Sequence, residues 1–129
     1  MGKDRYMVAV VDDEESVRRA LARLFRSAGL DVETYASGAA FLESLDTHSP
    51  DCVLLDLHMP SLNGFDVQAR LGKRVPVIVL TGHDTGESYK RAILAGAAAY
   101  LRKPVDDRTL LDTIAAVVDV KSGGGAGPH

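Results

Sequence analysis

Short apolar runs alternate along the chain with longer segments in which apolar residues recur every three or four positions. The runs are continuous and rich in β-branched residues, which predicts strands that are buried on both faces. They are residues 6–11, 52–55, 75–80 and 98–101. A fifth segment, 32–35, alternates apolar and polar residues. This alternation predicts a strand with one poorly covered side, at the edge of a sheet.

The segments between the runs have the spacing of amphipathic helices. These predicted helices are 17–28, 39–45, 65–71, 88–95 and 109–118, of which the third is short. Ser37 is placed to cap the second helix, and Gly29 and Gly96 stand where glycine commonly ends helices.

Regular alternation of strands and helices predicts an α/β fold, a doubly wound parallel sheet of about five strands with helices on both faces. A length of 129 residues is that of one domain, which we expect to span residues 1–120. The glycine-rich residues 121–129 have the composition of a flexible tail. In such folds ligands bind at the carboxyl ends of the strands.

Composition excludes several classes of function. The formal net charge of −3 argues against a direct nucleic-acid partner. We find neither a secretory signal nor an apolar stretch long enough to cross a membrane, so no membrane partner is expected. The single cysteine, Cys52, cannot form an internal disulfide, which fits a reducing, cytoplasmic location.

Polar residues follow four of the predicted strands, at the positions where a ligand would bind. They are Asp12 and Asp13, Asp56, Thr81, and Lys103 followed by Pro104. Two carboxylates about 4 Å apart repel by about 4 kcal/mol at an effective dielectric constant of 20, so three of them require a compensating cation. Because the donors are oxygens without a His or Cys cluster, the expected ion is Mg²⁺.

Each of these residues also has a simpler interpretation. One of the paired acids could cap the helix that begins near Ser16, Asp56 could be a turn residue, and Lys103 could be a solvated lysine before a turn proline. Separate explanations do not account for the occurrence of all of them at the carboxyl ends of parallel strands. The joint pattern therefore favours a functional cluster.

Four segments together resemble the receiver domain of two-component response regulators, in order and spacing, from about residue 6 to 119. They are VDDEESVRRAL, LLDLHMPSLNGFD, VIVLTGH and GAAAYLRKPVD. TYASGAAFLESL and LTGH are further similar to receivers that precede helix-turn-helix output domains. The resemblance implies a flavodoxin-like sheet with strand order 2-1-3-4-5. It also implies a phosphoacceptor that catalyses its own phosphorylation and slow dephosphorylation, rather than an enzyme.

In that family the acid matched by Asp56 accepts a phosphoryl group from a phosphohistidine. The donor would be a sensor histidine kinase or a histidine phosphotransfer domain. By the same resemblance, Asp13 would bind Mg²⁺ directly and Asp12 mostly through water. Asp56 and the backbone carbonyl of His58 would complete the ligands, and Lys103 would pair with a phosphoryl oxygen.

The resemblance also assigns the residues that would change conformation when Asp56 is phosphorylated. Thr81 would donate its hydroxyl to the phosphoryl group, and Tyr100 would turn inward in response. The peptide bond before Pro104 would be cis. His58 and His83 would flank the acylphosphate and tune the attack of water on it.

The output surface implied by the resemblance is the fourth helix, fifth strand and fifth helix, about residues 86–119. It would contact a downstream effector or form a phosphorylation-dependent dimer. The arginines of the first helix are either a solvated face or a docking site for an acidic partner; they are Arg18, Arg19, Arg23 and Arg26. Ala98 and Ala99 depart from the acidic residues that many receivers have there.

Other classes fit less well. No Gly-x-Gly-x-x-Gly follows a strand and no phosphate-binding Gly-x-x-x-x-Gly-Lys-Ser/Thr is present. A haloacid-dehalogenase-like phosphatase would need a second acid where His58 stands. A degenerate receiver that acts only as an interaction module is disfavoured because every phosphorylation residue is retained. Hydrolysis of phosphomonoesters would favour the phosphatase. Partner binding that phosphorylation does not change would favour the interaction module.

Overall fold

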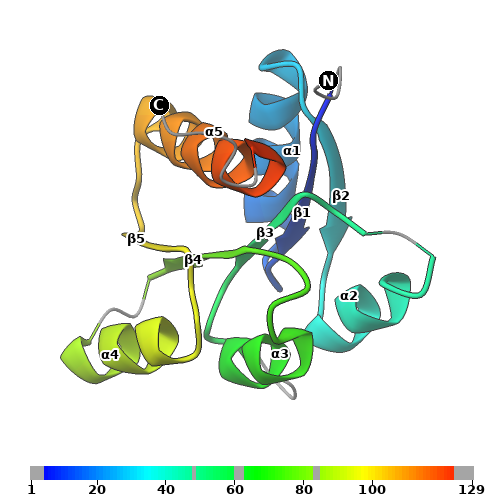
Figure 1. Cartoon of the computed structure of the whole chain (residues 1–129). Coiled ribbons are helices and arrows are strands. Elements are labelled where there is room, and N and C mark those ends of the chain that lie inside the picture. The colour runs from blue at the N-terminus through cyan, green and yellow to red at the C-terminus, as the bar shows by residue number, and fades with distance from the viewer. Residues whose placement is uncertain (1–4, 48, 60–62, 83–84, 124–129) are drawn as a thin grey trace.

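The computed structural model describes residues 5–47, 49–59, 63–82 and 85–123 of the chain (Figure 1). Its elements in order are β1 (Met7–Val11), α1 (Glu15–Ser27), β2 (Asp31–Tyr35), α2 (Gly38–Ser44), β3 (Cys52–Leu55), α3 (Gly64–Leu71), β4 (Val77–Thr81), α4 (Gly86–Leu94), β5 (Ala99–Arg102) and α5 (Asp107–Gly123). Within these ranges, no helix combines the length and the apolar character that crossing a bilayer requires.

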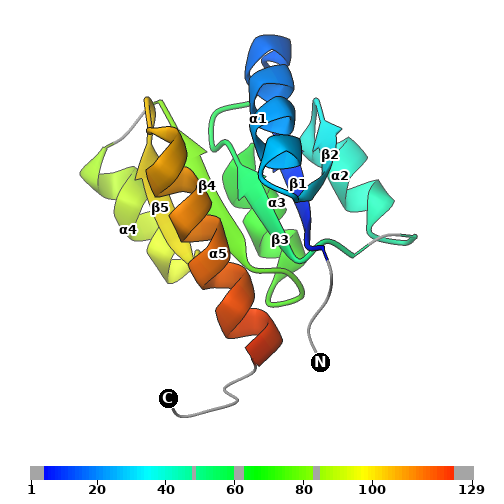
Figure 2. The same ribbon diagram turned by 90° about the horizontal axis from the view of Figure 1, so that it is seen from above.

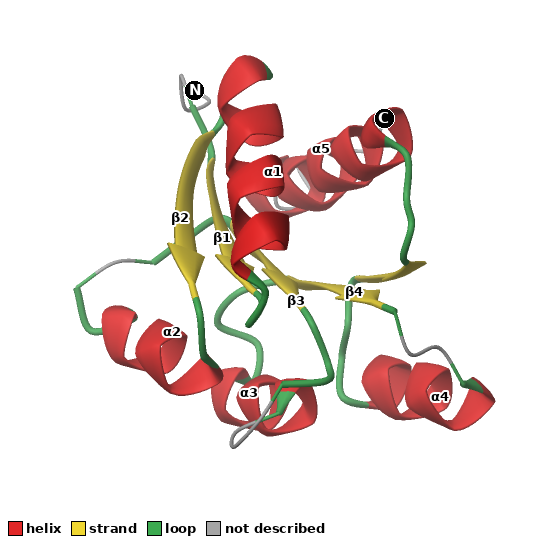
Figure 3. Ribbon diagram, turned by 180° about the vertical axis from the view of Figure 1, so that it is seen from behind, coloured by secondary structure: helices red, strands yellow, loops and turns green. Residues whose placement is uncertain are grey.

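All five strands pair in parallel, in the order β2-β1-β3-β4-β5. This confirms the predicted fold class and strand order, and it places β2 at an edge of the sheet as its alternating pattern predicted. The helices form two layers: α1 and α5 cover one face, and α2, α3 and α4 cover the other (Figures 2 and 3).

Two apolar clusters fill the space between the sheet and these layers. Phe25 and Ile114 belong to the cluster under α1 and α5, and Phe41 and Val67 to the cluster under the other three helices. The central strands β3 and β4 are buried at every position, because successive side chains point alternately into the two clusters. The continuous apolar runs of the sequence follow from this double coverage.

The prediction that 98–101 is a strand buried on both faces is wrong. β5 runs from Ala99 to Arg102, and its first three residues are only partly buried while Arg102 is exposed. The reason is its position: β5 pairs with β4 alone and forms the second edge of the sheet. Four small or apolar residues in a row do not distinguish an edge strand from a central one.

The predicted capping signals are found at the ends of α1, α2 and α4. The Ser37 side chain accepts a hydrogen bond from the Ala40 amide at the start of α2. Gly29 and Gly96 have positive φ angles of 85° and 97° just beyond α1 and α4, a conformation that glycine adopts without steric cost. α5 is longer at both ends than the predicted 109–118 and extends to Gly123. Residues 124–129, the remainder of the predicted tail, lie outside the described residues.

Candidate functional site

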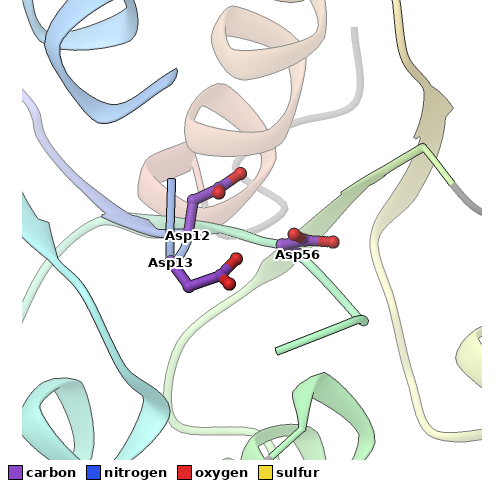
Figure 4. Close-up of side chains that lie close together, drawn as sticks. All are labelled: Asp12, Asp13 and Asp56. Carbon is purple, nitrogen blue, oxygen red and sulfur yellow. The ribbon is translucent and has the colours of Figure 1, made fainter. Parts of the chain in front are cut away.

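The fold brings three carboxylates together at the carboxyl edge of the sheet. Asp12 and Asp13 follow β1, and Asp56 follows β3, which is the neighbour of β1 (Figure 4). One carboxylate oxygen from each residue lies within 4.8 Å of the other two. Asp12 and Asp56 are buried, whereas Asp13 is exposed. The cluster is therefore open to solvent on the side of Asp13.

The ammonium group of Lys103 lies against this cluster. Its Nζ is 2.9 Å from Oδ2 of Asp12 and 3.8 Å from Oδ2 of Asp56. Lys103 follows β5, and the peptide bond between it and Pro104 is cis, as the resemblance implied. The lysine is thus an ion-pair partner of two buried acids and not merely a solvated residue before a turn.

Burial and charge shift the pKa values of the acid and of the lysine. Burial is the main cause that raises the pKa of Asp56; the His58 amide and the Lys103 charge oppose it, while the charges of Asp12 and Asp13 reinforce it. Burial disfavours the charged form of Lys103, but the hydrogen bond to Asp12 and the charge of Asp56 outweigh it, so the pKa of Lys103 is raised. The lysine stays protonated, and Asp56 is less acidic than an ordinary carboxyl group.

Backbone amides fix the two buried carboxylates. Oδ1 of Asp12 accepts a hydrogen bond of 2.9 Å from the amide of Glu14. Oδ1 of Asp56 accepts one of 3.1 Å from the amide of His58. Asp56 therefore does stabilise a turn, in addition to its place in the cluster. Neither Asp12 nor Asp13 is the N-cap of α1: that position is Glu14, which makes no capping bond through its side chain.

The other predicted site residues surround the cluster. Thr81 is the last residue of β4 and is fully buried, and its carbonyl accepts a hydrogen bond of 2.8 Å from the Lys103 amide. The Tyr100 ring is partly buried on β5, and its centroid is 5.2 Å from that of Tyr89, with the two rings at 87°. His58 is exposed two residues after Asp56, whereas His83 lies outside the described residues.

Two residues that support the cluster were not predicted for that role. Nη1 of Arg18 donates a hydrogen bond of 2.8 Å to the Asp12 carbonyl, so at least this arginine of α1 is not simply solvated. A Cβ atom on Gly64 would lie 2.6 Å from the carbonyl oxygen of Asp56, so only glycine lets α3 approach the backbone there. The available sequence signal was the Asn63-Gly64 pair, a combination that is common in turns.

The start of α3 is fixed by a reciprocal cap. Asn63 accepts a hydrogen bond from the Asp66 amide through its side chain, and the Asp66 carboxylate accepts one from the Asn63 amide. This arrangement is the capping box, which satisfies two amides at the helix start. The start of α3 is therefore well defined at Asn63.

The donor set suits a hard divalent cation. The three converging groups are all carboxylates, and Mg²⁺ binds oxygen ligands, usually a few carboxylates together with waters. The single ammonium of Lys103 offsets only part of the charge of three ionised acids. A divalent cation would remove the remaining repulsion.

Comparison with known proteins finds similarity to response regulators. The profile of the response regulator receiver domain matches residues 8–115. Nodulation protein W of Bradyrhizobium diazoefficiens is 40% identical over 116 residues, which are 88% of this chain and 51% of that protein. Transcriptional regulatory protein FixJ of Azorhizobium caulinodans is 37% identical over 112 residues, 84% of this chain and 53% of that protein. The chain spans about half the length of these relatives.

Solved structures agree with the sequence comparison. A response regulator receiver protein from Burkholderia phymatum is 48% identical with a TM-score of 0.81, covering 88% of this chain and 94% of its own. The N-terminal part of FixJ is 32% identical with a TM-score of 0.83, covering 92% of this chain and 96% of its own. The fold and the order of the strands are therefore shared along almost the whole chain.

Proposed function

This chain belongs to the response regulator receiver domain family, whose members generally accept a phosphoryl group at an acidic, Mg²⁺-dependent pocket, and we propose that its acceptor is the carboxylate of Asp56. The single observation that carries the proposal is the convergence of Asp12, Asp13 and Asp56 beside the Lys103 ammonium. A nucleophilic carboxylate among other acids becomes reactive toward phosphate when cations neutralise the approaching negative charges.

The proposed reaction transfers one phosphoryl group. An oxygen of the ionised Asp56 carboxylate attacks phosphorus as the bond from phosphorus to the donor's imidazole nitrogen breaks. The electron pair of that bond returns to the imidazole, and an acylphosphate forms on Asp56. Burial raises the pKa of Asp56, which makes its carboxylate a more basic nucleophile than an exposed one, while the site keeps it reachable from the side of Asp13.

The residues that would hold Mg²⁺ are those of the carboxylate cluster. We assign Asp13 as the direct ligand, Asp12 as a ligand acting mostly through water, and Asp56 and the His58 carbonyl as the others. The bound ion would screen the incoming phosphoryl oxygens and align them with Asp56. Asp12 is held for this purpose by three contacts, to Lys103, to the Glu14 amide and to Arg18.

Lys103 and Thr81 would bind the oxygens of the attached phosphoryl group. Lys103 already lies 3.8 Å from Oδ2 of Asp56, so a small movement of a flexible side chain transfers its ammonium from the acids to the phosphoryl group. Thr81 lies at the end of the next strand and would donate its hydroxyl. Tyr100 would respond by rotating away from its edge-on contact with Tyr89.

We assign the output surface to α4, β5 and α5. Among the described residues, the large apolar side chains that are exposed all lie on α4: Tyr89 is 50% exposed, Ile93 42% and Leu94 88%. Apolar groups gathered on one helix mark a surface that another protein covers. Its partner would be an effector domain, or a second copy of the chain when Asp56 is phosphorylated.

The remaining parts of the proposal concern the cellular context. The phosphodonor would be a sensor histidine kinase or a histidine phosphotransfer domain in the cytoplasm. The relative FixJ carries the name of a transcriptional regulatory protein, and the chain matches about half of it. We therefore propose transcription as the output, exerted through an effector domain and not through direct contact of this domain with nucleic acid.

Incubation with acetyl phosphate, with Mg²⁺ or with a chelator, tests the proposed function. Intact-mass spectrometry of the parent should show one added phosphoryl group that depends on Mg²⁺, and Asp56→Asn should show none. Asp13→Asn serves as the second variant, with a lower affinity for Mg²⁺ and an intact acceptor. Equal labelling of Asp56→Asn, or steady hydrolysis of a phosphomonoester, would overturn the proposal.

A further inference from the structure

A buried glutamine joins α3 to α4. Gln68 lies on α3 and is only 2% exposed. Its Nε2 donates a hydrogen bond of 3.2 Å to the carbonyl oxygen of Ala92 on α4, which is itself fully buried. In the part of the chain that the structure describes, Oε1 of the same amide is buried without a hydrogen-bond partner. A buried amide with one unsatisfied end calls for an explanation, because such groups are rare in folded proteins.

The carbonyl that Gln68 contacts belongs to the motif that ends α4. The amide of Ala97 also donates to the Ala92 carbonyl, at 3.0 Å, and the amide of Gly96 donates to the Ile93 carbonyl at 2.9 Å. This pair of bonds, with Gly96 at a positive φ, is the Schellman arrangement. Gln68 therefore joins the middle of α3 to the C-terminal capping motif of α4.

The other end of α3 rests on the proposed acceptor. The Gly64 amide donates a hydrogen bond of 3.1 Å to the Leu57 carbonyl. The absence of a side chain on Gly64 brings the helix directly against the Asp56 carbonyl. The backbone at Asp56 and Leu57 is therefore in direct contact with the first turn of α3, and a shift of one would be transmitted to the other.

A second contact joins the same two helices. The guanidinium carbon of Arg91 lies 4.0 Å from the centroid of the Phe65 ring, a cation–π geometry. Arg91 precedes Ala92, and Phe65 lies one helical turn before Gln68. The two helices are thus joined at one patch by a contact near the surface and a hydrogen bond in the core.

We propose that Gln68 is a positioning residue that couples Asp56 to α4 through α3, by a route separate from Thr81 and Tyr100; this rests on the proposed function of Asp56. In the unphosphorylated chain Gln68 holds the Ala92 carbonyl. Phosphorylation of Asp56 displaces α3 and loosens this hold. This hydrogen bond costs little free energy to break, because burying the unsatisfied Oε1 offsets much of the stabilisation that the bond provides. If α3 and α4 separate enough to admit water, Oε1 gains a hydrogen-bond partner.

The test compares Gln68→Met with Leu71→Met. Methionine has about the length of glutamine but cannot donate the hydrogen bond, and Leu71 is a 1% exposed residue of the same helix that receives the same new side chain. In the unphosphorylated protein, hydrogen exchange of the Ala97 amide should accelerate about three- to tenfold in Gln68→Met. It should stay near the parent value in Leu71→Met, while thermal unfolding verifies that both variants fold.

The second readout follows the same amide after treatment with acetyl phosphate and Mg²⁺. Phosphorylation should accelerate Ala97 exchange in the parent and in Leu71→Met, and change it little in Gln68→Met, where the hold is already lost. Equal acceleration in all three proteins, or unchanged exchange in unphosphorylated Gln68→Met, would overturn the role of Gln68. Failure of Asp56 to label would instead refute the proposed function, and the exchange of the unphosphorylated variants would still decide whether Gln68 holds α4.

Discussion

Two buried aspartates flank β3, and their surroundings differ. Asp51 precedes the strand and is 4% exposed, and Asp56 follows it and is 7% exposed. Oδ2 of Asp51 accepts a hydrogen bond of 2.8 Å from the Met7 amide, and the Asp51 amide returns one of 2.8 Å to the Met7 carbonyl. Asp51 thus joins the starts of β1 and β3. Asp56 instead lies with two more acids and a lysine.

The difference shows that burial of a carboxylate does not by itself indicate a functional site. Both carboxylates are removed from water and both accept a backbone amide, which stabilises a buried charge. Of the two, only Asp56 shares its surroundings with further negative charges, so only there would a bound cation relieve repulsion. At the amino end of β3 the buried carboxylate joins two strands, and at the carboxyl end it belongs to a cluster of acids beside an ammonium group.

The largest effect on stability is expected when the Lys103 ammonium is removed from the carboxylate cluster around Asp56. Lys103→Met leaves three carboxylates together without their ammonium, and in the presence of a chelator it should lower the free energy of unfolding by about 2–4 kcal/mol. Saturating Mg²⁺ should restore about 2–3 kcal/mol of this loss. Urea denaturation with and without Mg²⁺ measures both values. A variant as stable as the parent in chelator would show that Lys103 does not neutralise the cluster.

The same substitution at the two aspartates should act in opposite directions. Asp51→Asn weakens a charge-assisted hydrogen bond and should lower the free energy of unfolding by about 1–2 kcal/mol. Asp56→Asn relieves like-charge repulsion and should raise the free energy of unfolding in chelator by about 1 kcal/mol. Urea denaturation of both variants at neutral pH checks the signs, and destabilisation of equal size by both would remove the distinction between the two ends.

The pH dependence sharpens this contrast. Because the pKa of Asp56 is higher in the folded chain than its usual value of 3.8, the folded state retains this proton when the unfolded chain has lost it. The contribution of Asp56 to stability therefore falls as pH rises from the usual carboxyl value through the raised one. The advantage of Asp56→Asn over the parent should grow across this window and vanish below it. An advantage that is independent of pH would contradict the assigned cause.

The smallest effect concerns the lifetime of the phosphoryl group. His58 is exposed two residues after Asp56, and we propose that it obstructs the approach of water to the acylphosphate. His58→Ala should therefore accelerate dephosphorylation by roughly twofold to tenfold. A change of this size is expected when water reaches the acylphosphate more easily, whereas loss of a general acid or base would change the rate by a larger factor. The decay of phosphorylated protein measures this rate. Slower decay in His58→Ala would mean that the imidazole orients water instead of excluding it.

The sequence predicts the fold because its local and global signals agree. Continuous apolar runs indicate the central strands, and the alternating run places β2 at an edge. The local pattern of residues 98–101 does not predict the partial exposure of β5, whereas the strand order implied by the family resemblance already placed the fifth strand at an edge with one neighbour. The convergence of Asp12 and Asp56 follows from the rule that parallel strands end at one edge.

The finer features of the site depend on side chains that the chain brings together over long distances. The ion pair between Lys103 and Asp12 joins residues 91 positions apart, and the hydrogen bond between Gln68 and Ala92 joins residues 24 apart. No local pattern specifies either contact. The spacing of Asn63 and Asp66 is a local pattern, since it matches a capping box with aspartate in place of the usual glutamate, and it could have been recognised.

Locating the phosphoryl group by reduction tests the central claim most directly. Borohydride reduces an acylphosphate to an alcohol and thereby converts the modified aspartate to homoserine, which peptide fragmentation assigns to one position. After treatment with acetyl phosphate, we expect homoserine at position 56 with Mg²⁺ and only a trace with chelator. Asp51 lies five residues away and is also buried, so it serves as the internal control. Homoserine at position 51, 12 or 13, or equal conversion of Asp56 without Mg²⁺, would contradict the account.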